Sequence, residues 1–326
     1  MPNKPMLPAL NFAKKRRFGP LALVMPLLYM GCKLGFTRPL LKSILTQLFG
    51  EERSKAYSFL GYTPTEHDVF VTTFLKSGTN WSLQIAQQIA CGGEADFDHI
   101  HDIVAWPEPP MPGRISLYDP APQEYASTGY RVIKTHVDAD YVPFNPQSKY
   151  ITVFRDPKEV FVSSYHFVLG ILGLRSYVSV EDWLELFTSG DALSRAWAEH
   201  TTSFWKWREH PNVLVMTFRE MKQDFEGSIR KIEALMDVKL TPEQFEKVKE
   251  KSSFSYMKKH NNKFAPPWLP WVKSPTAMVR SGKSGASGEL LSPEQKERID
   301  SFSRQAAFEL LPDFPYDELF PPDSKN

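Results

Sequence analysis

The stretch Val69–Trp81, which reads VFVTTFLKSGTNW, decides the fold. Residues 69–74 are apolar or β-branched without interruption, which is typical of a strand buried on both faces of a parallel sheet. From Trp81 to Ala90 the apolar residues recur at helical spacing, so we expect a helix after a short turn. A strand, a turn and a helix in this order begin an α/β unit.

The turn Leu75–Thr79 has the features of an anion-binding loop. At a helix N-terminus, free backbone N–H groups and the positive end of the helix macrodipole face outward. Gly78 lets the backbone approach a ligand closely, Ser77 and Thr79 add hydroxyl donors, and Lys76 adds a positive charge. The loop therefore predicts phosphate binding, and the alternative is an ordinary turn with a solvated lysine. Because Lys76 precedes the glycine, this is not a Walker A sequence, and a nucleoside triphosphatase is disfavoured.

The same alternation continues along the chain. Further strands are predicted at 131–135, 150–154 and 213–218, and helices at 160–169, 180–187, 192–209, 225–236 and 242–251. This pattern predicts an α/β fold with a central, mostly parallel sheet flanked by helices on both faces. Because no repeat or linker divides the chain, we expect a single domain over residues 45–326 after an N-terminal extension of residues 1–44. The irregular stretches 105–123 and 261–288 are expected to be lids or binding loops.

A second strand, turn and helix carry another set of phosphate-binding side chains. Arg155 directly follows the strand at 150–154, and its guanidinium fork fits the oxygens of a phosphate. Ser163 lies two turns into the next helix and can donate to the same group. We therefore expect a second phosphate site beside the first.

Together these segments resemble the cytosolic-type sulfotransferase family, whose nucleotide is 3′-phosphoadenosine 5′-phosphosulfate (PAPS). The family's Lys-Ser-Gly-Thr-x-Trp loop, which holds the 5′-phosphosulfate, is similar to Lys76, Ser77, Gly78, Thr79, Asn80 and Trp81. Its Arg-x-x-Lys-x-x-x-x-Ser segment, which holds the 3′-phosphate, is similar to Arg155, Lys158 and Ser163. The resemblance covers roughly residues 68–298 and implies the family's P-loop-like nucleotide-binding fold.

Lys134-Thr135-His136, at the end of the second strand, resembles the family's Lys-Thr-His. The resemblance implies that Lys134 contacts the cofactor and that His136 is the catalytic histidine. With an ordinary pKa of about 6.5, a histidine can take a proton from an acceptor hydroxyl near neutral pH. We expect Lys76 and Lys134 to neutralise charge on the bridging oxygen and on the sulfuryl group.

Two weaker matches complete the nucleotide site. Arg280, Ser281 and Gly282 resemble the loop over the 3′-phosphate, although Ser281 stands where lysine is usual. Ser252 and Phe254 resemble the adenine-side Thr-Ser-Phe segment, with Ser252 in place of threonine. Phe218 stands where the family commonly has a tyrosine, so the hydrogen bond of that tyrosine is expected to be missing.

The resemblance implies an enzyme that moves a sulfuryl group in line from PAPS to a hydroxyl of a small acceptor and leaves 3′-phosphoadenosine 5′-phosphate (PAP). The segments expected to border the acceptor contain Trp106, Phe167, Phe264 and Trp268, and such a lining suits a hydrophobic alcohol or phenol. We expect no metal, because no cluster has ligand spacing. The alternatives are a Mg²⁺-dependent phosphotransferase that uses the Lys76 loop and a non-catalytic nucleotide-binding or membrane-surface protein.

Composition limits the partners and the compartment. The 326 residues hold 39 Lys and Arg against 38 Asp and Glu, a net charge of +1, which disfavours a nucleic-acid binder. Only Cys32 and Cys91 are present, so a disulfide scaffold is excluded and a reducing, cytoplasmic location is expected. The family's dimer segment would fall at 288–297, where this sequence departs from it, so we expect a monomer or a different dimer.

The N-terminal extension has a basic run before an apolar one. Lys14, Lys15, Arg16 and Arg17 precede the apolar residues 18–30, which are too short and too rich in proline to span a membrane. We expect a helix that packs on the domain or makes a peripheral contact with a membrane surface, and the alternative is a cleaved signal.

Overall fold

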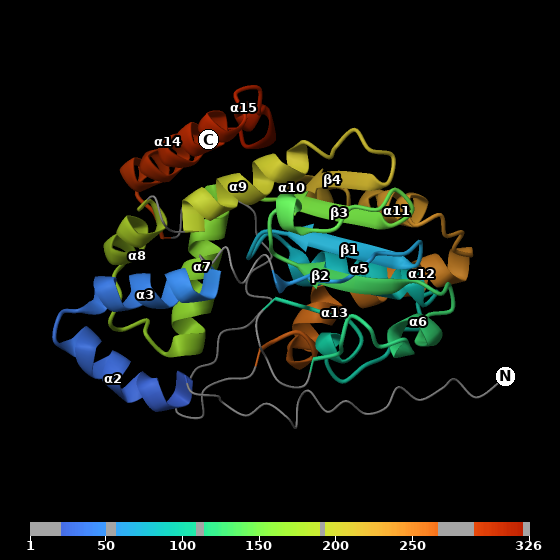
Figure 1. The fold of residues 1–326 in the computed structure, drawn as a ribbon, viewed down its shortest axis with the longest axis horizontal. Helices are drawn as coiled ribbons and strands as arrows, with labels where there is room; N and C mark the ends of the chain where they lie inside the picture. The colour runs from blue at the N-terminus through green and yellow to red at the C-terminus, as the bar shows by residue number, and fades with distance from the viewer. Residues whose placement is uncertain (1–20, 50–56, 109–113, 190–192, 267–289, 322–326) are drawn as a thin grey trace.

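The computed structural model describes residues 21–49, 57–108, 114–189, 193–266 and 290–321 (Figure 1). At its centre four parallel strands lie in the order β2-β1-β3-β4. They are β1 (Asp68–Thr73), β2 (Arg131–Thr135), β3 (Lys149–Phe154) and β4 (Val213–Thr217). In the middle of the sheet, Val71 of β1 pairs with Lys134 of β2 and with Ile151 of β3. The predicted α/β fold with a parallel sheet is confirmed.

Both faces of the sheet are buried, as its continuous apolar strands predict. Successive side chains of β1 enter different cores: Phe70 joins one hydrophobic cluster, whereas Val69 and Val71 join the other. In β3, Tyr150 joins the cluster of Phe70, where the two rings stack at 5.0 Å, and Ile151 joins the opposite one. The sheet therefore separates two helical layers.

The layer over Phe70 and Tyr150 holds the long helices that gather on the left of Figure 1. They are α7 (Pro157–Leu172), α8 (Val180–Phe187), α9 (Leu193–Trp205) and α14 (Pro293–Leu310), followed by the short α15 (Tyr316–Leu319). The sequence prediction omitted α14, whose residues are mostly polar. A capping box from Ser292 starts this helix, and Ile299 and Ala307 pack it into the core.

The other layer holds α5 (Thr79–Ala90), α11 (Phe225–Leu235), α12 (Pro242–Ser252) and α13 (Phe254–Lys259), on the right of Figure 1. Two short helices lie beside the strands: α6 (Ala121–Tyr125) precedes β2, and α10 (Phe218–Gln223) follows β4. Single turns of 3-10 helix occur at Ile100–Asp102, Ala139–Tyr141 and Asn261–Lys263. Of the stretch expected to be irregular at 105–123, the described residues 105–108 and 114–120 are not helical and the end begins α6.

The N-terminal extension contributes α2 (Leu21–Lys33) and α3 (Thr37–Phe49), which pack on the layer of α7 and α8. Met25 and Leu41 are fully buried in the same cluster as Phe161 of α7. The Tyr29 hydroxyl donates to the Leu172 carbonyl oxygen at 2.6 Å, at the C-terminal end of α7. The expected boundary between residues 44 and 45 falls inside α3. Among the described helices, none is both long and apolar enough to cross a bilayer.

Candidate active site

The candidate site lies where β1 and β3 end side by side. The chain leaves β1 into α5 on one face of the sheet and leaves β3 into α7 on the other. In an open parallel sheet, such a reversal opens a crevice at the carboxyl ends of the strands, and ligands bind there. The two segments predicted to bind phosphate, which begin near Lys76 and Arg155, are the two that flank this crevice.

The loop after β1 has the geometry of an anion cradle. Lys76 has φ 66° and Gly78 has φ 101°, so both residues adopt the left-handed conformation. A lysine in that region costs about 1–2 kcal/mol, so surrounding contacts must hold it there. A Cβ on Gly78 would lie 2.9 Å from the Phe218 ring, so glycine is required for packing as well as for φ. The Ser77 hydroxyl is buried and has no hydrogen-bond partner within the described part of the chain.

Arg155 ties the two strand ends together. Its Nη1 donates to the Lys76 carbonyl oxygen at 2.7 Å and thereby holds the left-handed turn. Its Nε donates to Glu159 at 2.9 Å, and its guanidinium lies 4.2 Å from the Phe218 ring centroid. The guanidinium is therefore oriented on three sides at the mouth of the Lys76 loop.

Lys158 belongs to the same sequence motif as Arg155 but points elsewhere. Its Nζ donates to Asp300 of α14 at 2.6 Å and lies 3.2 Å from Asp156. The Tyr316 hydroxyl donates to the same carboxylate of Asp300 at 2.9 Å. Lys158 therefore anchors the C-terminal helices on α7.

Lys76 itself lies against α7. Its Nζ sits 3.7 Å from the centroid of the Phe167 ring, and Ser163 occupies the same helix face one turn earlier. Burial and the neighbouring charges of Arg155 and Lys134 lower the pKa of Lys76 to about 7. The loop therefore concentrates positive charge in a place with little water, which favours an anionic ligand.

His136 extends from the end of β2 to the end of β1. Its Nδ1 lies 2.6 Å from the carbonyl oxygen of Thr73, and because a carbonyl only accepts, Nδ1 carries the proton. Nε2 is then the basic nitrogen. Burial, and next the charge of Lys134, hold the pKa of His136 well below its ordinary value, so the ring is neutral at pH 7.

Trp106 joins His136 to Lys134. The Lys134 Nζ lies 3.4 Å from the centroid of the indole ring, and the His136 ring meets the indole edge to face at 5.6 Å. Burial lowers the pKa of Lys134, and the charge of Glu108 opposes that shift. The Trp106 indole therefore contacts both the Lys134 ammonium and the neutral His136 imidazole.

Glu108 is the site residue that the sequence prediction missed. Its carboxylate accepts from the Trp106 indole N–H at 2.8 Å, from the His136 backbone N–H at 2.9 Å and from the Thr135 hydroxyl. Burial raises the pKa of Glu108, and the three donors and Lys134 oppose the rise. Its sequence signal is weak, because an isolated glutamate in a proline-rich loop resembles a solvated one.

Ser252 and Phe218, two of the residues considered for the adenine side, meet at Trp81. The Trp81 indole donates to the Ser252 carbonyl oxygen at 2.9 Å, and its ring packs edge to face on Phe218 at 5.7 Å. The Ser252 hydroxyl is buried and unpaired within the described residues. Phe254, the first residue of α13, has 41% of its surface exposed.

One predicted pocket residue, Phe264, contributes its backbone to the loop after β1 and its ring to the core. Phe264 is buried in the core beside Phe97, and its carbonyl oxygen accepts from the Asn80 amide at 3.3 Å. Trp268 lies outside the described residues, as do Arg280, Ser281 and Gly282.

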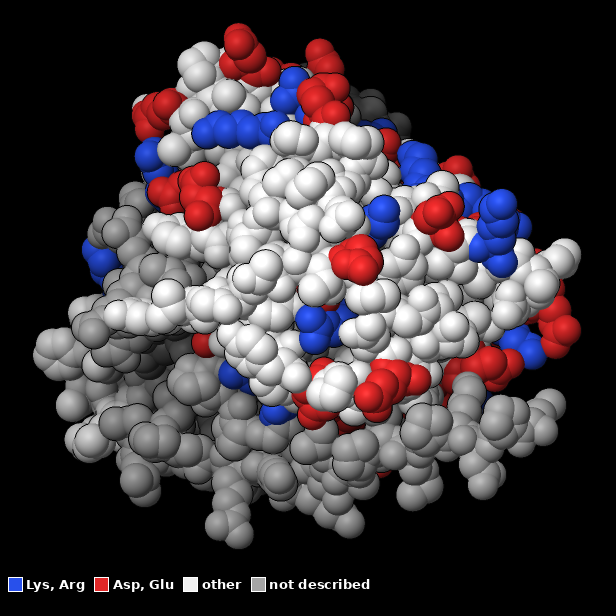
Figure 2. Space-filling view, turned by 45° about the vertical axis from the view of Figure 1, so that its right-hand side comes forward, with Lys and Arg blue, Asp and Glu red and all other residues white. Residues whose placement is uncertain are grey.

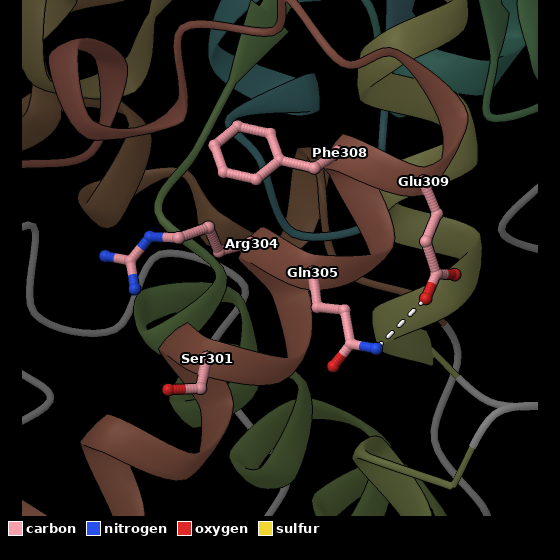
Figure 3. A pocket seen from close by; sticks show the side chains of 5 residues that line it. All are labelled: Ser301, Arg304, Gln305, Phe308 and Glu309. Carbon is pink, nitrogen blue, oxygen red and sulfur yellow. Dashed lines mark hydrogen bonds between the residues drawn. The ribbon is translucent and has the colours of Figure 1, made fainter.

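A surface hollow among the described residues lies on α14. The hollow in Figure 3 is shallow and contains none of the predicted site residues. It is lined by Ser301, Arg304, Gln305, Phe308 and Glu309 of α14. On the face drawn in Figure 2, basic and acidic side chains of the described residues are interspersed, in keeping with the balanced charge of the chain.

Comparison with known proteins adds independent support. The family model of the sulfotransferase domain matches residues 66–311, a range that includes every predicted site residue. Sulfotransferase 1B1 of Mus musculus is 31% identical over 237 residues, which are 68% of this chain and 74% of that protein. Sulfotransferase 2A1 of Macaca fascicularis is 28% identical over 260 residues, 78% of this chain and 88% of that protein.

A solved structure of a retinol dehydratase in complex with retinol and PAP shares the fold. Its TM-score is 0.62 at 20% identity, and the match covers 77% of this chain and 83% of that one. The expected family is thereby confirmed, because the family match spans most of the chain and the fold agrees over the same extent. The chain belongs to the sulfotransferase family.

Proposed function

We propose that this sulfotransferase uses PAPS as its donor and transfers the sulfuryl group to a hydroxyl of a small hydrophobic alcohol or phenol. The observation that carries the proposal is the buried, unpaired hydroxyl of Ser77, in a left-handed turn between the cations of Lys76 and Arg155. Burying a hydroxyl without a partner costs about 1–3 kcal/mol, so such a group is retained where a ligand completes it.

The chain's residues fit an adenosine nucleotide with two anionic ends. Lys76, Ser77, Gly78 and Thr79 would hold the 5′-phosphosulfate, and Arg155 with Ser163 would hold the 3′-phosphate. The second unpaired buried hydroxyl, that of Ser252, lies beside Trp81 and Phe218, where aromatic rings suit an adenine. When bound, PAPS supplies the activated sulfuryl group, whose transfer spreads negative charge over its oxygens.

Each catalytic residue then has a defined task. His136 accepts the proton of the acceptor hydroxyl at Nε2, because Nδ1 is committed to the Thr73 carbonyl oxygen. Lys76 and Lys134 provide positive charge close to His136. The two reacting oxygens must lie in line with the sulfur, so positioning by the rigid ends of β1 and β2 supplies much of the catalysis.

The described residues of the acceptor side include two aromatic rings. Phe167 and Trp106 each present a ring face to a catalytic lysine, so an acceptor beside them meets apolar surface. A hydrophobic alcohol or phenol suits this lining. The retinol dehydratase of similar fold is in complex with retinol, a hydrophobic alcohol, and PAP. Cys32 and Cys91 are buried and not joined in a disulfide, which suits a reducing cytoplasm, where we place the activity.

The experiment that tests the proposal is calorimetric titration with PAP, without added metal, of the wild-type protein and Arg155→Ala. We expect the wild type to bind and the variant to bind about 10- to 100-fold more weakly, because charge-assisted hydrogen bonds to phosphate are lost. Arg155→Lys should recover only part of the affinity, since an ammonium lacks the planar fork.

The matched control is Arg208→Ala, which removes the same charge from an exposed position beside Trp205. It should bind PAP like the wild type. Sulfuryl transfer from PAPS to a panel of phenols, sterols and other alcohols then identifies the acceptor class. Folded wild-type protein that binds no PAP would overturn the proposal.

A further inference from the structure

The charges of the chain are unevenly distributed between its first fifty residues and the rest. Residues 1–50 contain eight Lys or Arg and no Asp or Glu, which leaves 31 basic and 38 acidic residues for the remaining chain. The N-terminal segment is thus strongly basic although the whole protein is nearly neutral. Such an asymmetry is typical of a segment that contacts an anionic surface.

The described part of this segment also exposes apolar side chains. Along α2, Met25, Leu28 and Cys32 are buried in the core. Leu27, Met30 and Leu34 repeat at the same spacing on a different face, with 61%, 53% and 67% of their surfaces exposed.

Phe36, in the connection to α3, is 58% exposed and extends this apolar surface. We call Leu27, Met30, Leu34 and Phe36 the docking face. A helix that is apolar on its exposed face as well as its buried one has a partner for the exposed face.

The core fixes the orientation of the docking face. The Tyr29 hydroxyl bonds to the Leu172 carbonyl oxygen, and the rings of Tyr29 and Tyr177 lie 5.9 Å apart. Arg38 on α3 pairs with Asp182 of α8 at 2.7 Å, which joins the second helix to the same layer. The apolar side chains are therefore presented outward on a rigid support.

We propose that the docking face binds the surface of an anionic lipid bilayer. An interfacial helix buries its apolar side chains among the headgroups and acyl chains, and nearby lysines and arginines bind the anionic lipid surface. The docking face supplies the apolar part, with the exposed Lys33 at its edge. The basic run Lys14 to Arg17, a few residues before α2 in the sequence, supplies the charge. Charge complementarity favours a lipid surface over a second copy, because two copies would bring like-charged segments together.

Docking would also orient the proposed active site. The helix α7 runs from the Arg155 end of the crevice to Leu172, where Tyr29 holds it, and Phe167 lies between the two. The acceptor side of the site, at Phe167, therefore lies nearer to the docking face along α7 than Arg155 does. A lipophilic alcohol dissolved in the bilayer is the acceptor that this arrangement suits, and this consequence rests on the proposed function.

Co-sedimentation of the full chain with vesicles tests docking without any measurement of activity. Vesicles of phosphatidylcholine alone are compared with vesicles of phosphatidylcholine and phosphatidylglycerol. We expect binding to the anionic vesicles that weakens as salt is raised. Replacing Lys14, Lys15, Arg16 and Arg17 by Gln should lower the partition coefficient at least about tenfold, since each basic residue near such a surface adds binding energy.

The double variant Met30→Asp, Leu34→Asp should also lower the partition by about tenfold or more, because two exposed apolar side chains no longer insert. Its control is Phe308→Asp, which places one carboxylate at an exposed aromatic residue on α14, on the opposite side of the helical layer from α2 (Figures 1 and 3). Circular dichroism verifies that each variant is folded.

Two results would overturn the proposal. One is no sedimentation of the wild type with anionic vesicles. The other is a dimer in sedimentation velocity that the double variant converts to a monomer while vesicle binding is unaffected, because the face would then join two copies. Because PAP titration is measured separately, failure of docking and failure of the proposed sulfuryl transfer remain distinguishable.

Discussion

The loop after β1 and the ion cluster around Lys158 differ in whether their buried polar groups have partners. In the loop, the Ser77 hydroxyl is buried without a partner in the described residues, beside a lysine whose pKa is about 7. In the cluster, Lys158 has Asp156 and Asp300 as partners, and Tyr316 donates to the same carboxylate of Asp300. Both regions lie close to Arg155 in the sequence or in space.

This difference distinguishes residues that are available to bind a ligand from residues that stabilise the fold. Polar groups that a fold leaves unpaired at an energetic cost are available to a ligand, whereas groups that satisfy one another stabilise the structure. By this criterion, Arg155 and Lys158 have different roles although they lie three residues apart in one motif. Glu108 is intermediate, because its carboxylate is fully engaged but two of its donors belong to His136 and Trp106.

The largest expected effect is at His136. His136→Ala should lower kcat for sulfuryl transfer by about 100- to 10,000-fold, because the acceptor hydroxyl loses its general base. PAP affinity in calorimetry should change little, since no cofactor phosphate contact is assigned to the imidazole. A variant with the wild-type rate would place the base elsewhere.

Lys158→Met tests the supporting half of the comparison. Removing the ammonium leaves the buried Asp156 without its cation, whereas Asp300 keeps Arg304 at 3.0 Å, so the free energy of unfolding should fall by about 3 kcal/mol. Urea denaturation measures this change. PAP affinity of the folded protein should stay near the wild-type value. Weaker PAP binding with unchanged stability would show instead that Lys158 holds the nucleotide.

Glu108→Gln tests the intermediate case. An amide keeps the size of the side chain but has one acceptor oxygen for three donors, so His136 and Trp106 lose part of their support. We expect kcat to fall about tenfold with KM nearly unchanged, because Glu108 orients a catalytic group without contacting the substrate itself. Because the charge of Glu108 raises the pKa of Lys134, the alkaline limb of the pH–rate profile should move to lower pH.

That movement is the readout that separates positioning from packing, since a packing defect alone would leave the profile in place. Glu108→Asp, which restores the carboxylate, should restore the profile. Equal loss of stability and rate in both variants, with an unmoved profile, would contradict the assignment.

The smallest expected effect is the pH dependence of PAP binding. The pKa of Lys76 is about 7 in the nucleotide-free protein, and an anionic ligand must raise it. Above pH 7 binding therefore takes up a proton, and affinity should fall by about fivefold between pH 7 and pH 8. Calorimetry in two buffers with different ionisation enthalpies measures the proton uptake. Lys76→Arg, which stays charged, should reduce both effects, and the remainder belongs to Lys134, whose pKa burial lowers to about 7.

Local sequence patterns predict most of the fold. The continuous apolar runs of β1 and β3 predict strands buried on both faces, and the helix at 180–187 has the predicted bounds because a capping box starts it. The helix α14 escaped prediction because its exposed face is polar and only a few of its residues enter the core. Such a helix depends on its tertiary partners more than on its own pattern.

The sequence by itself determined the binding loop, because an anion site at a strand-to-helix turn is built from neighbours along the chain. Only the tertiary structure decided the roles that depend on which partners a side chain reaches. Arg155 precedes the N-cap Asp156 and lies outside the helix, whereas Lys158 lies in the first turn of α7, where Asp300, 142 residues later in the chain, accepts from it. Glu108 reaches His136 across 28 residues. Such long-range contacts follow from how the layers pack, and no local spacing encodes them.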